Sequence, residues 1–301
     1  MIKNVIRIIL MTIVAPKILI YLSQYFSIFM KVQLPDLLVI YENKDISDQC
    51  QIIESSELNH CEDVVIVDDD DDDDLNPILA TCDNRFNYNT VLGVFENGNL
   101  SGSLQLVNPY VDLNNKIDGT VIKVDIENVE NDYNFHPLGL DVSPKNNKRI
   151  FIVNHAVEGS KIDIFNMDYD LGKAFKVKSI QHPLIISPNS ISVINDNMFY
   201  VSNDHLFNLR DQSLKGKILN WIETFLRLPL GNVLLVKFNE NNDELDVNYA
   251  ANFIPYANGL VRVNEDLLAV ASTNTNQVRL YQINKENHEL SKLRSVHVPL
   301  S

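Results

Sequence analysis

The chain has 301 residues, with 25 lysines and arginines against 40 aspartates and glutamates, so its formal net charge is −15. Nucleic-acid binding needs basic patches, and this acidic composition therefore argues against a nucleic-acid partner. The length suffices for one large domain or two small ones.

The first predicted element is the apolar stretch of residues 5–30, which Arg7 and Lys17 interrupt. A membrane-spanning helix needs about 20 apolar residues, and basic residues at its start favour a cytoplasmic N-terminus with the body translocated. We expect residues 1–31 to be an uncleaved signal-anchor; a cleaved signal peptide and a buried helix are the alternatives. The body would then be lumenal or extracellular, either membrane-anchored or secreted, and the sequon at Asn99 could carry a glycan.

The next features are an acidic run and three cysteines. Residues 68–74 are seven consecutive aspartates, and because like charges repel, we interpret them as a solvated insertion between two strands. The cysteines are Cys50, Cys61 and Cys82. An odd number leaves at least one unpaired unless it bonds another chain. Pairing of Cys61 with Cys82 is conceivable, although nothing in the sequence requires it.

From Leu75 onward, short apolar runs rich in Val, Ile, Phe and Tyr alternate with turn residues. Examples are TVIKVDIENV, RIFIVNHA, MFYVSND and NVLLVKFNE. Runs of this kind are typical of strands, and their repetition without helical patterns before residue 210 predicts an all-β sandwich or propeller.

One segment departs from the strand pattern. Apolar residues recur at spacings of three and four from Leu214 to Phe225, which places them on one face of a helix, and Pro229 ends it. Basic residues flank that face, so residues 214–228 suit contact with a membrane or lipid surface. Packing of the same face against the rest of the domain is the alternative.

The segment from His136 to His155 reads HPLGLDVSPKNNKRIFIVNH. A turn-forming stretch around Pro144 separates the apolar runs LGLDV and RIFIV, which predicts a hairpin with a histidine at each end and both imidazoles near one rim of a sheet. Imidazole changes charge near neutral pH and suits proton transfer. Taken alone, such a pair is more often made of surface or capping histidines.

The sequence HPLGLDV, the turn after it and IFIVNHAVEGSKIDIFNM resemble the second blade of the serum paraoxonase/arylesterase family, whose members are calcium-dependent six-bladed propellers. The resemblance covers roughly residues 45–300. It implies that residues 32–301 form a β-propeller of this type, with about four four-stranded blades and the C-terminal blades missing. Cys50 matches a cysteine that closes the ring in the family, and Pro137 replaces a usual glycine.

The resemblance also implies a catalytic site. His136 and His155 match the catalytic histidine dyad of the family. Glu62 in CEDVVI, Asn189 in SPNSISVI and Asn258 in YANGLVRV resemble ligands of its catalytic calcium. Carboxylate and amide oxygens are the ligands that calcium prefers.

A second, structural calcium is expected from the same resemblance. Asp63 and the backbone carbonyl of Leu138 match two of its ligands, whereas Ser190 replaces an aspartate, which should weaken or empty this site. The catalytic calcium is also incomplete here, because the Asp-Asn pair that completes it in the family would lie beyond Ser301.

These residues imply calcium-dependent hydrolysis of a small-molecule aryl ester or lactone. Calcium would polarise the carbonyl oxygen, His136 would accept a proton from water, and His155 would orient or relay. The alternative is a catalytically inactive, truncated propeller that acts as a binding module or is a gene remnant.

Overall fold

The computed structural model describes residues 53, 55–67, 75–83, 101–111, 117–208, 213–242 and 244–298. Residues 5–30, Cys50, the acidic run 68–74 and Asn99 lie outside these ranges, so the anchor, the insertion and the glycan stay predictions. The chain divides into two compact units, and the fold described below belongs to residues 51–297. In the described part, no helix is long and apolar enough to cross a bilayer.

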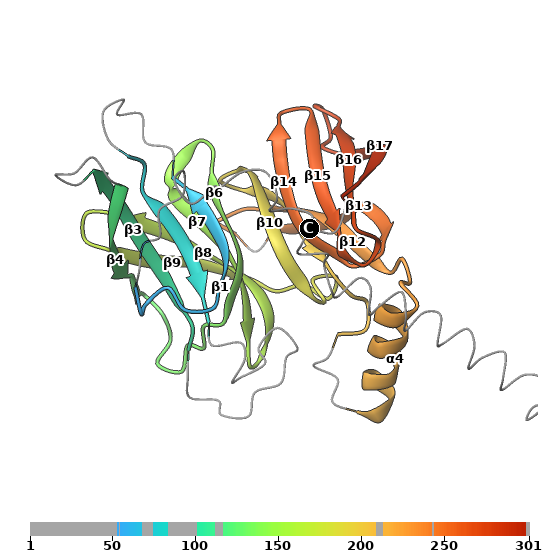
Figure 1. Ribbon diagram of the computed structural model, residues 1–301, viewed down its shortest axis with the longest axis horizontal. Coiled ribbons are helices and arrows are strands. Elements are labelled where there is room, and N and C mark those ends of the chain that lie inside the picture. The colour runs from blue at the N-terminus through green and yellow to red at the C-terminus, as the bar shows by residue number, and fades with distance from the viewer. Residues whose placement is uncertain are drawn as a thin grey trace, which may run out of the picture. The chain divides into compact units, whose positions relative to one another are not determined.

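Four sheets make up this unit, and in each the strands follow one another in space as they do in sequence, apart from the added strand β5 (Figure 1). The first sheet contains β1 (Cys61–Ile66), β2 (Ile78–Cys82), β3 (Ser103–Val111) and β4 (Ile117–Lys123). The second contains β6 (Pro137–Ser143), β7 (Asn146–Ala156), β8 (Gly159–Asp168), β9 (Lys173–Ile180) and β5 (Asp125–Glu127), which pairs in parallel with β9.

The third sheet contains β10 (Pro188–Asn195), β11 (Met198–Asn203), β12 (Gly231–Phe238) and β13 (Leu245–Ile254). The fourth contains β14 (Ala257–Asn264), β15 (Leu267–Ser272), β16 (Gln277–Ile283) and β17 (Leu290–His297), with the short 3-10 helix η3 (Thr273–Thr275) between β15 and β16. Four antiparallel meanders of this kind are propeller blades. The prediction of an all-β propeller with about four blades is therefore confirmed.

The core consists of three clusters of buried apolar side chains, one in each seam between neighbouring sheets. In β7, Ile150 and Ile152 face the first seam, whereas Phe151 and Val153 face the second. Successive side chains of a strand point to opposite faces, so a strand that is buried on both faces must be apolar throughout. This explains why the central strands read as unbroken runs such as RIFIV.

The first strand of each blade lies on the inside of the propeller, where β6 contacts β1 and β10, and β10 contacts β14. These inner strands belong to separate sheets, and side chains join them. The Asp63 carboxylate on β1 accepts the backbone N–H of Leu140 on β6 at 2.9 Å. The Asp141 carboxylate on β6 accepts the N–H of Val193 on β10 at 2.6 Å.

Serine hydroxyls continue this series of links from β10 to β14. The N–H of Leu260 donates to Ser190 Oγ, and the N–H of Arg262 donates to Ser192 Oγ, both at 3.2 Å. A step of two residues along β10 therefore corresponds to a step of two along β14 in the same direction. The two inner strands run parallel, and their first residues lie at the same end.

Helix α4 (Leu214–Phe225) begins at Ser213, whose hydroxyl accepts the N–H of Gly216 at 3.0 Å. Its buried residues are mostly polar: the Asn220 amide donates to the Phe207 carbonyl, and the Glu223 carboxylate accepts the N–H groups of Leu206 and Phe207 at 2.9 Å. The predicted helix is confirmed, but it packs through its polar face.

Adding a methyl group at Gly139 tests the close approach of β6 to β10. A Cβ atom at this position would lie 2.4 Å from the Asn189 carbonyl oxygen and 2.7 Å from the Cα of Ser190. Because both contacts are with backbone, the strands must separate, and we expect Gly139→Ala to lower the free energy of unfolding by about 1–3 kcal/mol. Urea denaturation measures this loss.

Gly259→Ala is the matched control, because a Cβ at Gly259 on β14 meets nothing within 4 Å. We expect its stability to stay within about 0.5 kcal/mol of the parent chain. Equal effects of the two substitutions would show that β6 and β10 are not in this close contact.

Candidate active site at the end of the inner strands

The two histidines lie at one end of the β6–β7 hairpin, as the sequence predicts. His136 directly precedes β6, and His155 is the penultimate residue of β7. The backbone N–H of His155 donates to the carbonyl of His136 at 2.9 Å. Both residues are buried, so they are not the surface histidines of the alternative interpretation.

Further polar contacts hold His136. Its ring Nδ1 lies 3.0 Å from Asp83 Oδ2, and both side chains are almost fully buried. Its backbone N–H donates to the amide oxygen of Asn154 at 2.8 Å. Asp83 follows β2 and is 53 residues away in sequence, so no local motif indicated this contact.

His155 has a different environment. Its Nε2 lies 2.8 Å from the carbonyl oxygen of Pro188, and its Nδ1 lies 3.1 Å from the hydroxyl of Ser160. A carbonyl oxygen only accepts hydrogen bonds, so Nε2 must carry the hydrogen, and in the neutral ring Nδ1 accepts from the serine hydroxyl. This geometry suits an orienting histidine better than one that relays protons through Nε2.

A buried polar network holds the side chain of Asn154. Its amide nitrogen donates to Asp163 Oδ2 at 2.7 Å, and the same oxygen accepts the hydroxyl of Tyr133 at 2.8 Å. Ser179 donates to the other carboxylate oxygen of Asp163. Burial raises the pKa of Tyr133, and the charge of Asp163 raises it further, so this phenol stays a hydrogen-bond donor. The network fixes Asn154, which in turn holds the backbone of His136.

The expected calcium ligands occupy equivalent positions in the fold. Glu62, Leu138, Asn189 and Asn258 are each the second residue of an inner strand, in β1, β6, β10 and β14 respectively. Links between neighbouring strands join Asp63 to Leu140 and Ser190 to Leu260, one or two residues farther along. The four positions therefore lie at one end of the inner strands, next to His136.

Glu62 also acts on Tyr256, which precedes β14. Burial raises the pKa of Tyr256 to about 12, with further contributions from the negative charges of Asp204 and Glu62. The Glu62 carboxylate, on the first blade, thus contributes to the electrostatic environment of a tyrosine two residues from Asn258. Glu62 is exposed and Asn189 is buried, so this group of oxygens extends from the solvent inward.

The residues expected at a structural calcium have other partners in the structure. Asp63 accepts the N–H of Val64 on one carboxylate oxygen and that of Leu140 on the other, both at 2.9 Å. The Leu138 carbonyl accepts the hydroxyl of Thr81 at 2.5 Å. Burial raises the pKa of Asp63, while these backbone hydrogen bonds lower it. Hydrogen bonds thus account for the burial of this carboxylate without a second ion.

Among the described residues, no group of three or more His, Cys, Asp or Glu side chains is arranged to hold a metal ion. The set of Glu62, Asn189 and Asn258 contains one carboxylate and two amides, so it is not a group of three His, Cys, Asp or Glu side chains. Amide and carboxylate oxygens nevertheless suit calcium, which accepts carboxamide ligands.

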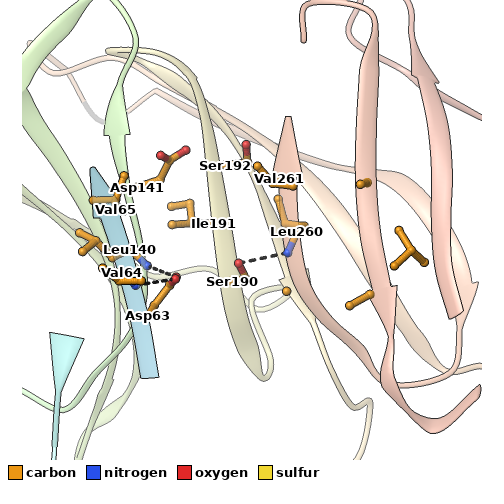
Figure 2. Close-up of a pocket in the computed structure, with 14 residues that line it drawn as sticks. Asp63, Val64, Val65, Leu140, Asp141, Ser190, Ile191, Ser192, Leu260 and Val261 are labelled. Atoms are coloured by element: carbon orange, nitrogen blue, oxygen red, sulfur yellow. Dashed lines mark hydrogen bonds between the residues drawn. The ribbon is translucent and has the colours of Figure 1, made fainter. Parts of the chain in front are cut away.

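A pocket of about 460 Å³ lies among the inner strands (Figure 2). Figure 2 shows Asp63, Asp141, Ser190 and Ser192 among aliphatic side chains such as Ile191, with the links from Asp63 to Leu140 and from Ser190 to Leu260 dashed. The two histidines do not line it. The pocket therefore borders the candidate site through the neighbours of Glu62 and Asn189, and does not contain the catalytic candidates.

A disulfide between Cys61 and Cys82 joins β1 to β2 at the same end. The two cysteines are directly paired across the strands. Glu62 follows one of them and Asp83 follows the other, so the bond fixes the expected calcium ligand relative to the carboxylate beside His136. It resolves the pairing that the sequence left open, while Cys50 lies outside the described residues.

Comparison with known proteins shows the family of the chain. Residues 47–300 match the protein family described as Arylesterase. The rabbit (Oryctolagus cuniculus) serum paraoxonase/lactonase 3 is 25% identical over 62% of this chain and 50% of its own length. The human serum paraoxonase/arylesterase 2 is 29% identical over 35% of this chain and 28% of its own. The chain belongs to the arylesterase family, and it spans half or less of the length of these relatives.

Two solved structures are similar to this chain at low sequence identity. A functionally unknown protein from Desulfotomaculum acetoxidans DSM 771 has a TM-score of 0.45 at 16% identity, covering 83% of this chain and 58% of its own. The periplasmic gluconolactonase PpgL of Pseudomonas aeruginosa has a TM-score of 0.42 at 11% identity, covering 74% and 54%.

Asp141 should make the stability of the propeller depend on pH. Burial raises the pKa of Asp141 to about 6, outweighing the lowering by the N–H groups of Val193 and Val142. The native state then binds a proton that the unfolded state, with a carboxyl pKa near its ordinary value of 3.8, has already released. The ionised carboxylate therefore costs roughly 3 kcal/mol at neutral pH, and this cost disappears as the pH falls from 6 to 4.

We expect Asp141→Asn to remove this dependence. The difference in free energy of unfolding between parent and variant, measured from pH 4 to pH 7, should change in favour of the variant as the pH rises. A difference that stays constant over this range would show that Asp141 titrates normally.

Proposed function

We propose that the chain is a calcium-dependent hydrolase of aryl esters or lactones. The observation that carries this proposal is the position of His136, which is buried against Asp83 at the end of the inner strands where Glu62, Asn189 and Asn258 also lie. Membership of the arylesterase family supports the reaction class. The names of the relatives, which include both arylesterase and lactonase, support the two substrate classes.

Calcium bound by Glu62, Asn189 and Asn258 would polarise the carbonyl oxygen of the substrate and stabilise the oxyanion. These three side chains bring a single negative charge and fewer oxygens than the 6 to 8 that calcium favours. Water would supply the remaining ligands. We therefore expect weak binding, with a dissociation constant on the order of 10⁻³ M, as in sites of low charge.

His136 would accept and return the proton. In the hydrolytic step, a water molecule gives its proton to Nε2 of the neutral ring while its oxygen forms a bond to the acyl carbon. The bond from the acyl carbon to the leaving oxygen then breaks, and the imidazolium returns the proton to that oxygen. The products are a carboxylic acid and an alcohol, or a hydroxy acid from a lactone. His155, bound to Pro188 and Ser160, orients this end of the hairpin.

The proposed hydrolysis is tested with phenyl acetate and a lactone, in millimolar calcium and in EDTA. Activity should appear with calcium and be lost with EDTA. Glu62→Gln removes the only carboxylate of the ligand set, so it should lose the response to calcium. His136→Gln should lower kcat about 10²–10⁴-fold while calcium binding, followed by calorimetry, is retained.

A variant with serines at positions 68–74 should replace the parent chain in the calorimetry, because the negative charge of seven aspartates attracts cations nonspecifically. Hydrolysis that persists in EDTA, or that survives His136→Gln, would contradict the proposal.

We propose the secretory pathway as the location of the body, with residues 5–30 holding it in a membrane. The apolar, basic-flanked sequence of residues 5–30 supports this. The Cys61–Cys82 disulfide adds support, because disulfides persist mainly in oxidising compartments.

A second proposed role, contact with a lipid surface, is favoured by the orientation of α4. Its polar residues Asn220 and Glu223 face the propeller, whereas Leu214, Ile218 and Trp221 are between 48% and 76% exposed. The Trp221 ring stacks on that of Phe225 with centroids 4.7 Å apart. An apolar helix face that is turned away from its own domain is available to enter the headgroup region of a bilayer.

Replacing two exposed residues of α4 tests the lipid contact. Leu214→Ser with Trp221→Ser should weaken binding to phosphatidylcholine vesicles by tenfold or more, since burying each side chain is worth roughly 1.5–3 kcal/mol. Leu171→Ser with Val157→Ser, which are 65% and 51% exposed on the second blade, should leave binding unchanged. An equal loss in both pairs, measured by vesicle co-sedimentation, would rule out a specific role for α4.

A further inference from the structure

The contact between Asp83 and His136 is built by several independent constraints. Asp83 is 4% exposed and His136 is 2% exposed, and Oδ2 of the first lies 3.0 Å from Nδ1 of the second. Asp83 directly follows Cys82, which is disulfide-bonded to Cys61. The backbone N–H of Asp83 donates to the carbonyl of His60 at 3.4 Å. The carboxylate is thus fixed by covalent and hydrogen bonds on the first blade, while the imidazole belongs to the second.

Gly102 lets these two groups approach. A Cβ at this position would lie 2.6 Å from Cδ of Pro137, 2.8 Å from the carbonyl of Cys82 and 3.0 Å from Cβ of Asp83. The N–H of Gly102 donates to the carbonyl of Phe135, the residue before His136, at 2.7 Å. Gly102, the residue before β3, is therefore packed between the segment that carries the aspartate and the segment that carries the histidine.

The chemistry of this pair fixes a tautomer. A carboxylate has only acceptor oxygens, so the neutral imidazole must place its hydrogen on Nδ1 to bond Asp83, and its basic lone pair is then on Nε2. His155 has the opposite arrangement, because its Nε2 hydrogen bonds to the Pro188 carbonyl. The two histidines of the hairpin are held in different tautomers.

We propose that Asp83 is the positioning residue of His136: it holds the ring with hydrogen on Nδ1 and so leaves Nε2 as the atom that takes the proton from water. This inference rests on the proposed function for its catalytic meaning. Asp83 also offsets the positive charge that His136 gains during the proton transfer, as a carboxylate behind a catalytic imidazole does. It acts through His136 and does not itself contact the reacting atoms.

The test reads the tautomer directly. In protein labelled with ¹⁵N-histidine at mildly alkaline pH, long-range ¹H–¹⁵N correlation spectra distinguish Nδ1–H from Nε2–H rings, and His136→Gln identifies the His136 signals. We expect the Nδ1–H pattern for His136 and the Nε2–H pattern for His155. Asp83→Asn should convert His136 to a mixture or to the Nε2–H form, because an amide nitrogen donates to Nδ1.

Asp204→Asn is the matched control. Asp204 Oδ1 also lies 3.0 Å from a histidine Nδ1, that of His205, and both residues are buried, although each is 9% exposed. This substitution should change the His205 signals and leave those of His136 unchanged. An Nε2–H pattern for His136 in the parent chain, or no change on Asp83→Asn with the fold intact by circular dichroism, would overturn the inference.

Kinetics separate this inference from the proposed function. In calcium, Asp83→Asn should lower kcat about 100-fold with KM changed less than threefold, and Asp83→Glu should recover part of the loss if it folds. A parent chain with the Nδ1–H pattern but no hydrolysis would contradict the proposed function and leave the role of Asp83 in the tautomer standing. A normal kcat in Asp83→Asn would exclude a positioning role.

Discussion

The hydrogen bonds that join one inner strand to the next are the interaction on which the rest of the structure depends. Blades pack face to face and belong to separate sheets, so no backbone ladder sets their relative height. Asp63, Asp141, Ser190 and Ser192 set it instead, each accepting a backbone N–H from the following blade. Apolar seams supply the driving force for packing, but apolar contacts are not directional, and these four side chains supply the register.

The register has a direct chemical consequence. Because the inner strands start at the same level, the second residue of each strand arrives at one end of the propeller, and three of those residues carry oxygen side chains, namely Glu62, Asn189 and Asn258. The hairpin adds His136 beside them, and β2 brings Asp83 behind the imidazole. Glu62 and Asp83 follow the two cysteines of one disulfide, so the same covalent bond fixes the proposed calcium ligand and the carboxylate beside His136.

The sequence predicts the parts that depend on local patterns. Apolar runs separated by turn residues predict the β6–β7 hairpin, and the spacing from Leu214 predicts α4, because both are encoded within a few residues. Asp83 was missed because its partner is 53 residues away, and no local pattern connects the two residues. The orientation of α4 depends on Asn220 and Glu223, which bind Phe207 and Leu206, and helical periodicity alone favours burial of the apolar face.

Terbium luminescence tests the central claim, that a cation binds at the end of the inner strands through Glu62. Tyr256 is close enough to feel the Glu62 charge and would sensitise the emission of a bound terbium ion. With residues 68–74 replaced by serine, we predict emission that excess calcium displaces, that Tyr256→Phe weakens and that Glu62→Gln abolishes. Emission that is absent from the chain, or that persists unchanged in Glu62→Gln, would contradict the account.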